Sequence, residues 1–308
     1  MKYEKEFTVA LAGNPNVGKS TVFNALTGLK QHTGNWVGKT VGNAAGSYTY
    51  NNNKYLITDL PGTYSLCAHS AEEIIACRHI CLEKPDVTVI VCDASCLERN
   101  LNLVLQITEI TSKAVLCVNM MDEAEKKNIK TDITKLSQQL GIPVAATSAR
   151  SKKGLDKLMQ AIESVALSKE SNDITLVYTS RIENAISQLL PLTEKIETDS
   201  RTKRFICLKL LQGDSDTVDS LCKKHGTDDN YLKALISAAD RLTVNNFTDE
   251  IISCIFITAE GIAAEGVKRS ANKKQVRDRK IDRILTGKLT GIPIMLLMLF
   301  IILWITIP

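Results

Sequence analysis

Hydrophobic and polar positions follow two alternating patterns in the first half of the chain. Short runs rich in apolar and β-branched residues predict six strands: Phe7–Gly13, Ala45–Tyr50, Lys54–Asp59, Asp86–Asp93, Ala114–Asn119 and Pro143–Thr147. Apolar residues at helical spacing predict helices between several of these strands and after the last: Lys19–Leu29, Ala71–Leu82, Leu97–Thr111, Ile133–Leu140 and Leu155–Leu167. This order predicts an α/β domain with a mostly parallel sheet and helices on both faces. Asn51–Asn53 predicts a hairpin turn.

The strand pattern fades after about residue 170. Apolar residues then recur at helical spacing in three groups: Ile182, Ile186, Leu189 and Leu190; Phe205, Leu208 and Leu211; and Ile251, Ile252, Ile255 and Ile262. A small all-α domain is therefore expected to follow the sheet domain. The predicted organisation is a nucleotide-binding domain over residues 1–170, a helical domain over 171–270, a basic linker over 271–290 and an apolar segment over 291–308.

The last segment predicts the start of a membrane span. Ile292–Ile307 carries no charge, and sixteen residues of helix rise about 24 Å, somewhat less than the roughly 30 Å hydrocarbon core. We therefore expect a first transmembrane helix that is cut short. Lys268–Lys288 holds nine basic residues against Asp278 and Asp282, and this surplus predicts that residues 1–290 lie on the cytoplasmic side.

Composition narrows the class of protein. The 308 residues are 44% hydrophobic and 23% charged, which excludes a collagen, a disulfide-rich miniprotein and a disordered chain. A net charge of +4 is too small to argue for nucleic-acid binding by itself. Nine cysteines lie in largely apolar stretches and no secretory signal is read at Met1–Glu6, so we expect reduced cytosolic thiols.

A phosphate-binding loop is predicted where the first strand meets the first helix. The segment Gly13–Ser20 reads G-N-P-N-V-G-K-S and fits G-x-x-x-x-G-K-[ST] in the strand–helix context that the motif needs. Its glycines let backbone N–H groups turn towards phosphate, and the helix N-terminus adds a favourable dipole. We expect Lys19 to reach the β- and γ-phosphates and Ser20 to bind Mg²⁺. The predicted nucleotide contacts here are Asn14, Pro15, Asn16, Val17, Gly18, Lys19, Ser20 and Thr21.

Two further segments predict switches that respond to the γ-phosphate. Switch II is Asp59, Leu60, Pro61 and Gly62, where Asp59 holds Mg²⁺ through water and the Gly62 N–H meets the γ-phosphate. Switch I is Gly34, Asn35, Trp36, Val37, Gly38, Lys39 and Thr40, in which Thr40 ligates Mg²⁺ when the γ-phosphate is present. Lys19, Thr40 and Gly62 are the expected catalytic groups.

A third motif predicts which base is bound. Asn119-Met120-Met121-Asp122 ends a strand, and the Asp122 carboxylate can accept hydrogen bonds from guanine N1–H and its 2-amino group. Adenine would leave that carboxylate opposed and unpaired, which favours GTP over ATP. Ser148 and Ala149, after the last strand, are expected to offer a backbone N–H to guanine O6.

These motifs together resemble the ferrous iron transporter B (FeoB) family. The resemblance is carried by G-N-P-N-V-G-K-S, G-N-W-V-G-K-T-V, D-L-P-G-T-Y-S-L, the stretch Asp93–Leu101 and N-M-M-D-E-A. It continues more loosely through the helical segment to Leu285-Thr286-Gly287 and Gly291-Ile292-Pro293. It implies a P-loop GTPase domain, a spacer domain that modulates GDP binding, and the entry to a membrane domain.

The resemblance also implies a cofactor, partners and a location. Asn16 and the Gly34–Gly38 backbone would bind K⁺, which would act as a fixed positive charge. Thr63 stands where many GTPases place a water-orienting glutamine, so hydrolysis should be slow. The implied partners are GTP or GDP, a downstream polytopic iron-permease domain and a small FeoA-like protein, in the inner (plasma) membrane of a bacterium. Homo-oligomerisation stays open, and Gly42, where relatives carry an acidic residue, leaves the end of switch I undefined.

We therefore expect a slow, Mg²⁺-dependent and K⁺-stimulated GTPase that switches between GTP and GDP states to control Fe²⁺ uptake. An Era-like assembly GTPase that binds RNA or the ribosome is the alternative, but residues 170–265 are neither strongly basic nor aromatic and no nucleic-acid partner is expected. A membrane-tethered module that binds GDP and hardly turns over is a third hypothesis. Cys77 and Cys81, four residues apart on one predicted helix, are interpreted as buried thiols rather than a metal site.

Overall fold

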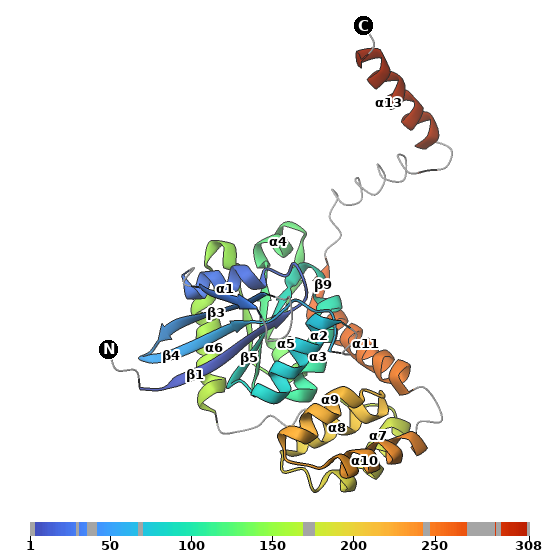
Figure 1. Cartoon of the computed structure of the whole chain (residues 1–308). Coiled ribbons are helices and arrows are strands. Elements are labelled where there is room, and N and C mark those ends of the chain that lie inside the picture. Colours follow the sequence, from blue (N-terminus) through green and yellow to red (C-terminus); the bar gives the residue numbers. More distant parts are fainter. Residues whose placement is uncertain are drawn as a thin grey trace.

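The computed structural model of the chain describes residues 4–28, 31–35, 42–66, 70–168, 176–242, 247–269, 287 and 291–306. A seven-stranded sheet with the order β2-β3-β4-β1-β5-β6-β8 forms the first domain (Figure 1). Its strands are β1 (Glu6–Gly13), β2 (Gln31–Asn35), β3 (Gly42–Tyr50), β4 (Asn53–Asp59), β5 (Val87–Asp93), β6 (Ala114–Asn119) and β8 (Val144–Ala146).

The sheet is parallel except at one edge. β4, β1, β5, β6 and β8 run in the same direction, whereas β3 is antiparallel to both β4 and β2. Leu11 is level with Asp59, and Asp93 is level with Asn119. The carboxyl ends of the parallel strands, where the predicted motifs lie, therefore meet along one edge of the sheet.

Helices cover both faces of the sheet, as predicted. They are α1 (Lys19–Thr27), α2 (Ala71–Arg78), α3 (Leu97–Ile110), α4 (Met121–Lys126), α5 (Ile133–Leu140) and α6 (Leu155–Leu167). Alternate residues of β1 enter different cores: Val9 and Leu11 pack with α1 and α6, whereas Ala10 and Ala12 face α2, α3 and α5. A π-helical turn (His79–Glu83) extends α2, and short 3₁₀ turns precede α3 and α6.

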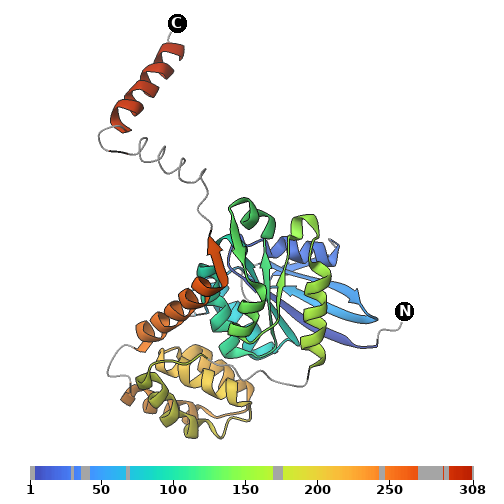
Figure 2. The ribbon, with the colours of Figure 1, turned by 180° about the vertical axis from the view of Figure 1, so that it is seen from behind.

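A helical domain packs against the α2–α3 side of the sheet domain (Figures 1 and 2). It contains α7 (Ser180–Leu189), the 3₁₀ turn Leu190–Thr193, α8 (Ser200–Leu211), α9 (Ser215–Lys224), α10 (Asp229–Leu242) and α11 (Phe247–Gly266). Asp199 caps α8 by accepting from the Thr202 N–H, and Asp214 caps α9 by accepting from the Thr217 N–H. The apolar core continues across both domains without a break.

The predicted core of the helical domain is largely confirmed. Ile182, Ile186, Phe205 and Ile255 are among its buried residues. Ile252 is an exception, because its side chain is 43% exposed. Ile251 and Ile255 are one helical turn apart and point into the core, and the position directly after Ile251 is rotated by about 100° away from that face.

The chain returns to the sheet domain after α11, which the sequence pattern did not predict. β9 (Val267–Arg269) pairs antiparallel with β7 (Ile129–Thr131) in a separate two-stranded sheet. The Asp132 N–H donates to the Gly266 carbonyl at 2.8 Å. A Cβ at Gly266 would lie 2.7 Å from the Leu136 side chain, so a glycine permits this close approach.

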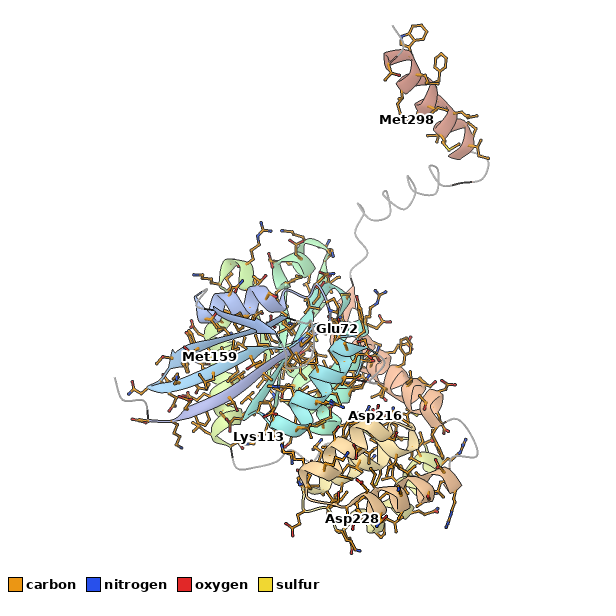
Figure 3. All side chains as sticks on the ribbon, in the orientation of Figure 1. Glu72, Lys113, Met159, Asp216, Asp228 and Met298 are labelled. Atoms are coloured by element: carbon orange, nitrogen blue, oxygen red, sulfur yellow. The ribbon has the colours of Figure 1, made fainter. Side chains whose placement is uncertain are left out.

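The apolar C-terminal segment forms α13 (Gly291–Thr306). Nearly all of its described side chains are exposed, and Met298 marks its middle in Figure 3. Among the residues that the structure describes, no helix has both the length and the apolar character that crossing a bilayer requires.

The observed strands differ from the predicted ones mainly at the sheet edge. β3 begins at Gly42 rather than Ala45, and β2 was not predicted at all. Gln31–Asn35 contains glycine and polar residues instead of an apolar alternation, because it is an edge strand paired only with β3. The hairpin turn between β3 and β4 is confirmed, with Asn51 and Asn52 at positive φ.

Two glycines with similar backbone angles provide a test of how tightly Gly154 packs against the end of β8. Gly154 has φ +79°, and a Cβ there would collide with the Ala146 carbonyl oxygen; Gly213 has φ +72° with open space around it. Gly213→Ala should cost about 1–2 kcal/mol of unfolding free energy, from left-handed strain alone. Gly154→Ala should cost about 1–3 kcal/mol more, because strain and overpacking add. Urea unfolding of both variants measures the difference, and equal losses would contradict this packing.

Candidate functional site

The phosphate loop joins the end of β1 to the start of α1. Gly18 has φ +82°, and a Cβ there would lie 2.5 Å from the Asn119 Nδ2, so a larger residue does not fit. Asn14 is 2% exposed, and among the described residues neither of its side-chain amide atoms has a hydrogen-bond partner. A buried, unpartnered amide at this position fits a loop shaped to receive a polar ligand.

Lys19 connects the phosphate loop to switch II. Its buried ammonium forms an ion pair with the Asp59 carboxylate and donates to the Leu60 carbonyl. The Ser20 hydroxyl lies 3.4 Å from Asp59 Oδ2. Three groups predicted separately from the sequence, the lysine, the hydroxyl and the aspartate, therefore converge on one point at the edge of the sheet.

Switch II lies directly against the phosphate loop. The Thr63 N–H donates to the Gly13 carbonyl at 3.2 Å, and a Cβ added to Gly62 would lie 3.3 Å from Pro15 Cα. Gly62 thus lies beside the phosphate loop, and its contact with the γ-phosphate stays a prediction. The Thr63 hydroxyl donates to the Ser65 carbonyl at 2.6 Å, so it is engaged within the segment.

The Asn119 side chain joins the phosphate loop to the segment Thr147-Ser148-Ala149, the base loop. Its Nδ2 donates to the Val17 carbonyl at 3.1 Å, and its Oδ1 accepts from the Ala149 N–H at 3.0 Å. The Thr147 hydroxyl also donates to this oxygen at 3.1 Å. The sequence predicts the segment Thr147-Ser148-Ala149 as a source of a backbone N–H for the base, but it does not predict this role of the Thr147 hydroxyl.

Asp122 lies beside this amide on the following turn. Its backbone N–H donates to the Ser148 hydroxyl at 3.2 Å, and Met120 before it has φ +59°. In the described part of the chain, the Asp122 carboxylate has no hydrogen bond. Behind this loop, burial raises the pKa of the Cys117 thiol to about 12, so that side chain stays neutral.

The oxygen atoms of Ser20 and Asp59 together could ligate a divalent cation such as Mg²⁺. Ser20 and Asp59 supply oxygen atoms, which Mg²⁺ prefers, and lie within reach of each other. Asn16, the predicted K⁺ ligand, is exposed on the loop with φ +66°. Gly34 and Asn35 lie in β2, where they pair with Asn43 and Gly42. The rest of switch I, Trp36, Val37, Gly38, Lys39 and Thr40, lies outside the described residues.

The remaining candidate residues lie partly away from this edge and partly within the loops already described. Cys77 and Cys81 are buried as predicted, with their sulfurs 3.8 Å apart, and burial raises the pKa of Cys81 well above its usual value. Pro15 and Thr21 lie on the loop and the first turn of α1, and neither is buried. Leu60 and Pro61 complete switch II, with Leu60 only 1% exposed.

Comparison with known proteins gives the same architecture. Residues 7–162 match the sequence family described as ferrous iron transport protein B, and residues 178–268 match the FeoB cytosolic helical domain. The crystal structure of the cytosolic domain of the T. maritima FeoB iron transporter in its apo form is 32% identical, with a TM-score of 0.71. The match covers 85% of this chain and 100% of that domain. Its GDP form II and GMPPNP form match with the same TM-score, 0.71.

Two full-length relatives cover nearly all of this chain. The Fe(2+) transport protein A/Fe(2+) transporter FeoB fusion protein of Porphyromonas gingivalis is 36% identical over 95% of the chain, and the Fe(2+) transporter FeoB of Salmonella typhimurium is 31% identical over 96%. The chain spans only 36% and 38% of their respective lengths. Family matches, fold and assembled motifs agree: the chain belongs to the FeoB family of ferrous iron transport proteins.

Proposed function

We propose that this chain binds GTP, hydrolyses it slowly to GDP, and regulates Fe²⁺ transport by a membrane domain through that cycle. The Asn119 amide network carries the proposal, because it joins the phosphate loop to the base loop at one edge of the sheet. GDP and GMPPNP forms of the similar T. maritima domain support guanine nucleotides as ligands. The regulated transport step rests on the printed names of longer relatives, and Fe²⁺ would be cargo rather than a ligand of these domains.

Binding would use charge at one end of the nucleotide and hydrogen bonding at the other. On nucleotide entry, the Lys19 ammonium would exchange its contact with Asp59 for the β- and γ-phosphates. Asp122 would accept the two guanine N–H groups, and the Ala149 region would face O6. The buried amide of Asn14 would gain the partner that it lacks within the described part of the chain.

Hydrolysis would depend on positioning rather than on a side-chain base. Ser20, Asp59 and Thr40 would hold Mg²⁺, and Asn16 with the switch I backbone would hold K⁺; together these ions supply positive charge to the phosphate oxygens. Gly62 would offer its N–H to the γ-phosphate. Because the Thr63 hydroxyl is bound to Ser65, water would be oriented by backbone groups and turnover would be slow.

The proposed organisation keeps the sequence boundaries: a G domain over 1–170, a GDI-like helical domain over 171–270, a basic linker over 271–290 and a membrane entry over 291–308. We place residues 1–290 on the cytoplasmic side of a bacterial inner membrane, next to a polytopic permease domain. A small FeoA-like partner is supported by the FeoA–FeoB fusion in Porphyromonas gingivalis.

The cation dependence of GTP turnover tests the proposal. We expect the chain to release phosphate from GTP with Mg²⁺, several-fold faster in K⁺ than in Na⁺. Asn16→Ala should remove this K⁺ stimulation while changing GTP affinity less than about threefold, because Asn16 is exposed on the loop and outside the base contacts. GDP binding without turnover in either salt would favour the tethered-module hypothesis, and stimulation that persists in the variant would reject the K⁺ role.

Lys19→Ala tests the phosphate end of the site. We expect GTP and GDP affinities to fall roughly 10- to 100-fold, the equivalent of about 1.5–3 kcal/mol for hydrogen bonds to a charged group. Equilibrium binding of both nucleotides measures this. Lys54→Ala, which removes a surface ion pair with Glu6 far along the sheet, is the control. Retained nucleotide affinity in Lys19→Ala would contradict the loop assignment.

Asp122→Asn tests the base end. Guanine nucleotide affinity should fall on the order of 100-fold, because the carboxylate that pairs with two N–H groups is replaced by an amide. Xanthine nucleotides should be bound better than by the parent chain, since their base edge offers an acceptor in place of the 2-amino group. Glu123→Gln, the neighbouring change on α4, should alter neither affinity. Unchanged GTP binding in Asp122→Asn would show that another residue reads the base.

A further inference from the structure

A buried lysine of the helical domain contacts Leu66, in the segment that directly follows switch II. Lys209, on α8, is 3% exposed, and its ammonium donates to the Leu66 carbonyl at 2.7 Å. The same ammonium forms an ion pair with Asp214 Oδ2 at 3.1 Å. Lysine is rarely buried this deeply without a specific partner, and here one of the two partners is a backbone group of the other domain.

Leu66 is held from both sides. Its N–H donates to the Gln106 Oε1 of α3 at 2.7 Å, while its carbonyl accepts from Lys209. Its side chain is 2% exposed within the core shared by the two domains. Both backbone groups of a single residue are therefore bound by side chains, one from the sheet domain and one from the helical domain.

Leu66 ends the D-L-P-G-T-Y-S-L segment that begins at Asp59. At the other end, Asp59 pairs with Lys19 of the phosphate loop, and the Thr63 N–H binds Gly13. Only three residues, Thr63, Tyr64 and Ser65, separate Gly62 from Leu66, so the reach of the backbone limits how far Gly62 can move while Leu66 is fixed. The position of Gly62, which we expect to face the γ-phosphate, would thus depend on the anchor at Leu66.

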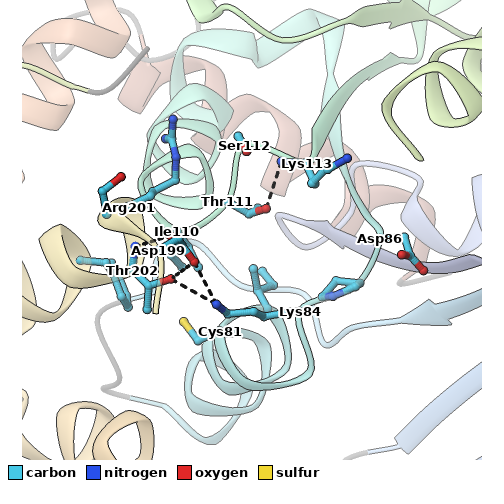
Figure 4. Close-up of a pocket in the computed structure, with 14 residues that line it drawn as sticks. Cys81, Lys84, Asp86, Ile110, Thr111, Ser112, Lys113, Asp199, Arg201 and Thr202 are labelled. Atoms are coloured by element: carbon cyan, nitrogen blue, oxygen red, sulfur yellow. Dashed lines mark hydrogen bonds and ion pairs between the residues drawn. The ribbon is translucent and has the colours of Figure 1, made fainter. Parts of the chain in front are cut away.

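Helix α8 is itself tied to the sheet domain. At its N-terminus, the Lys84 ammonium contacts Asp199 Oδ2 at 3.0 Å and the Thr202 hydroxyl at 3.5 Å, beside a cavity of about 330 Å³ (Figure 4). Arg201 donates to the Thr108 carbonyl of α3. Since these contacts lie away from Lys209, α8 would keep its place when the Lys209 ammonium is removed.

We infer that Lys209 is a positioning residue for GTP hydrolysis: its ammonium fixes Leu66, four positions after the last residue of switch II, so that Gly62 lies where the γ-phosphate is attacked. The inference rests on the proposed GTPase function and goes beyond it by naming the contact through which the helical domain acts. A purely structural role predicts a loss of stability, whereas a positioning role predicts slower turnover in folded protein at unchanged nucleotide affinity.

Lys209→Met separates these roles, because methionine has a similar length and no charge. We expect kcat for GTP to fall roughly 2- to 30-fold, within the range for changes that alter coupling between sites, while the Kd values for GTP and GDP stay within about twofold. Lys203→Met, a partly exposed lysine on the same helix, should leave kcat and both Kd values unchanged. Hydrogen exchange of a peptide covering residues 60–66 in the GDP-bound protein should be faster in Lys209→Met only.

Gln106→Leu removes the second anchor of Leu66 from within the sheet domain. It should reduce kcat in the same way, and the double variant should lose less than the product of the two single effects, because both act through one residue. This variant keeps the test decisive if Lys209→Met does not fold. Unchanged kcat and unchanged exchange in folded variants would overturn the inference, as would strict multiplicativity. A parent chain that binds GTP without hydrolysing it would instead reject the proposed function.

Discussion

The Asn119 amide is the contact on which the site depends, because one side chain satisfies backbone groups of two loops that are distant in sequence. It binds the Val17 carbonyl on the phosphate loop and the Ala149 N–H on the base loop. Buried amides left unsatisfied are costly, so its surroundings are constrained. Gly18 must be a glycine to leave room for it, and Thr147 supplies the remaining donor. The distance between the predicted phosphate contacts and the predicted base contacts thus depends on a single residue.

Helix α3 joins the sheet domain to the helical domain. Its inner face packs on β5 and β6, and its outer face meets α8 and α11 in one continuous core. Glu109 on α3 is 5% exposed and lies 3.7 Å from the Arg204 guanidinium of α8. Burial raises the pKa of Glu109 despite that cation. A helical domain attached through a shared core and buried polar groups moves with the sheet domain rather than independently of it.

The sequence predicts those parts of the fold in which apolar residues recur at a regular spacing or a strict motif is present. The central strands, the helices other than α4, α9 and α10, and the lysine–aspartate convergence at the phosphate loop belong to this class. The helices α4, α9 and α10 were not predicted. β7 and β9 were not predicted either, because three residues are too few for a period and their pairing joins distant segments. Lys209 was missed for another reason: a charged residue at a helix position normally predicts a solvated face. Its burial becomes visible only when Leu66 and Asp214 are placed around it.

The pairing of β9 with β7 determines how tension would be carried through the molecule. Arg269, the last described residue before the basic segment, is level with Ile129, and Val267 is level with Thr131. A pull on the chain beyond Arg269 would therefore load this short ladder before it reached α11. β7 follows α4, which contains Asp122. The force would therefore enter the sheet domain a few residues from Asp122. Along the strand axis the ladder resists as a unit in shear, whereas a perpendicular pull opens it one hydrogen bond at a time.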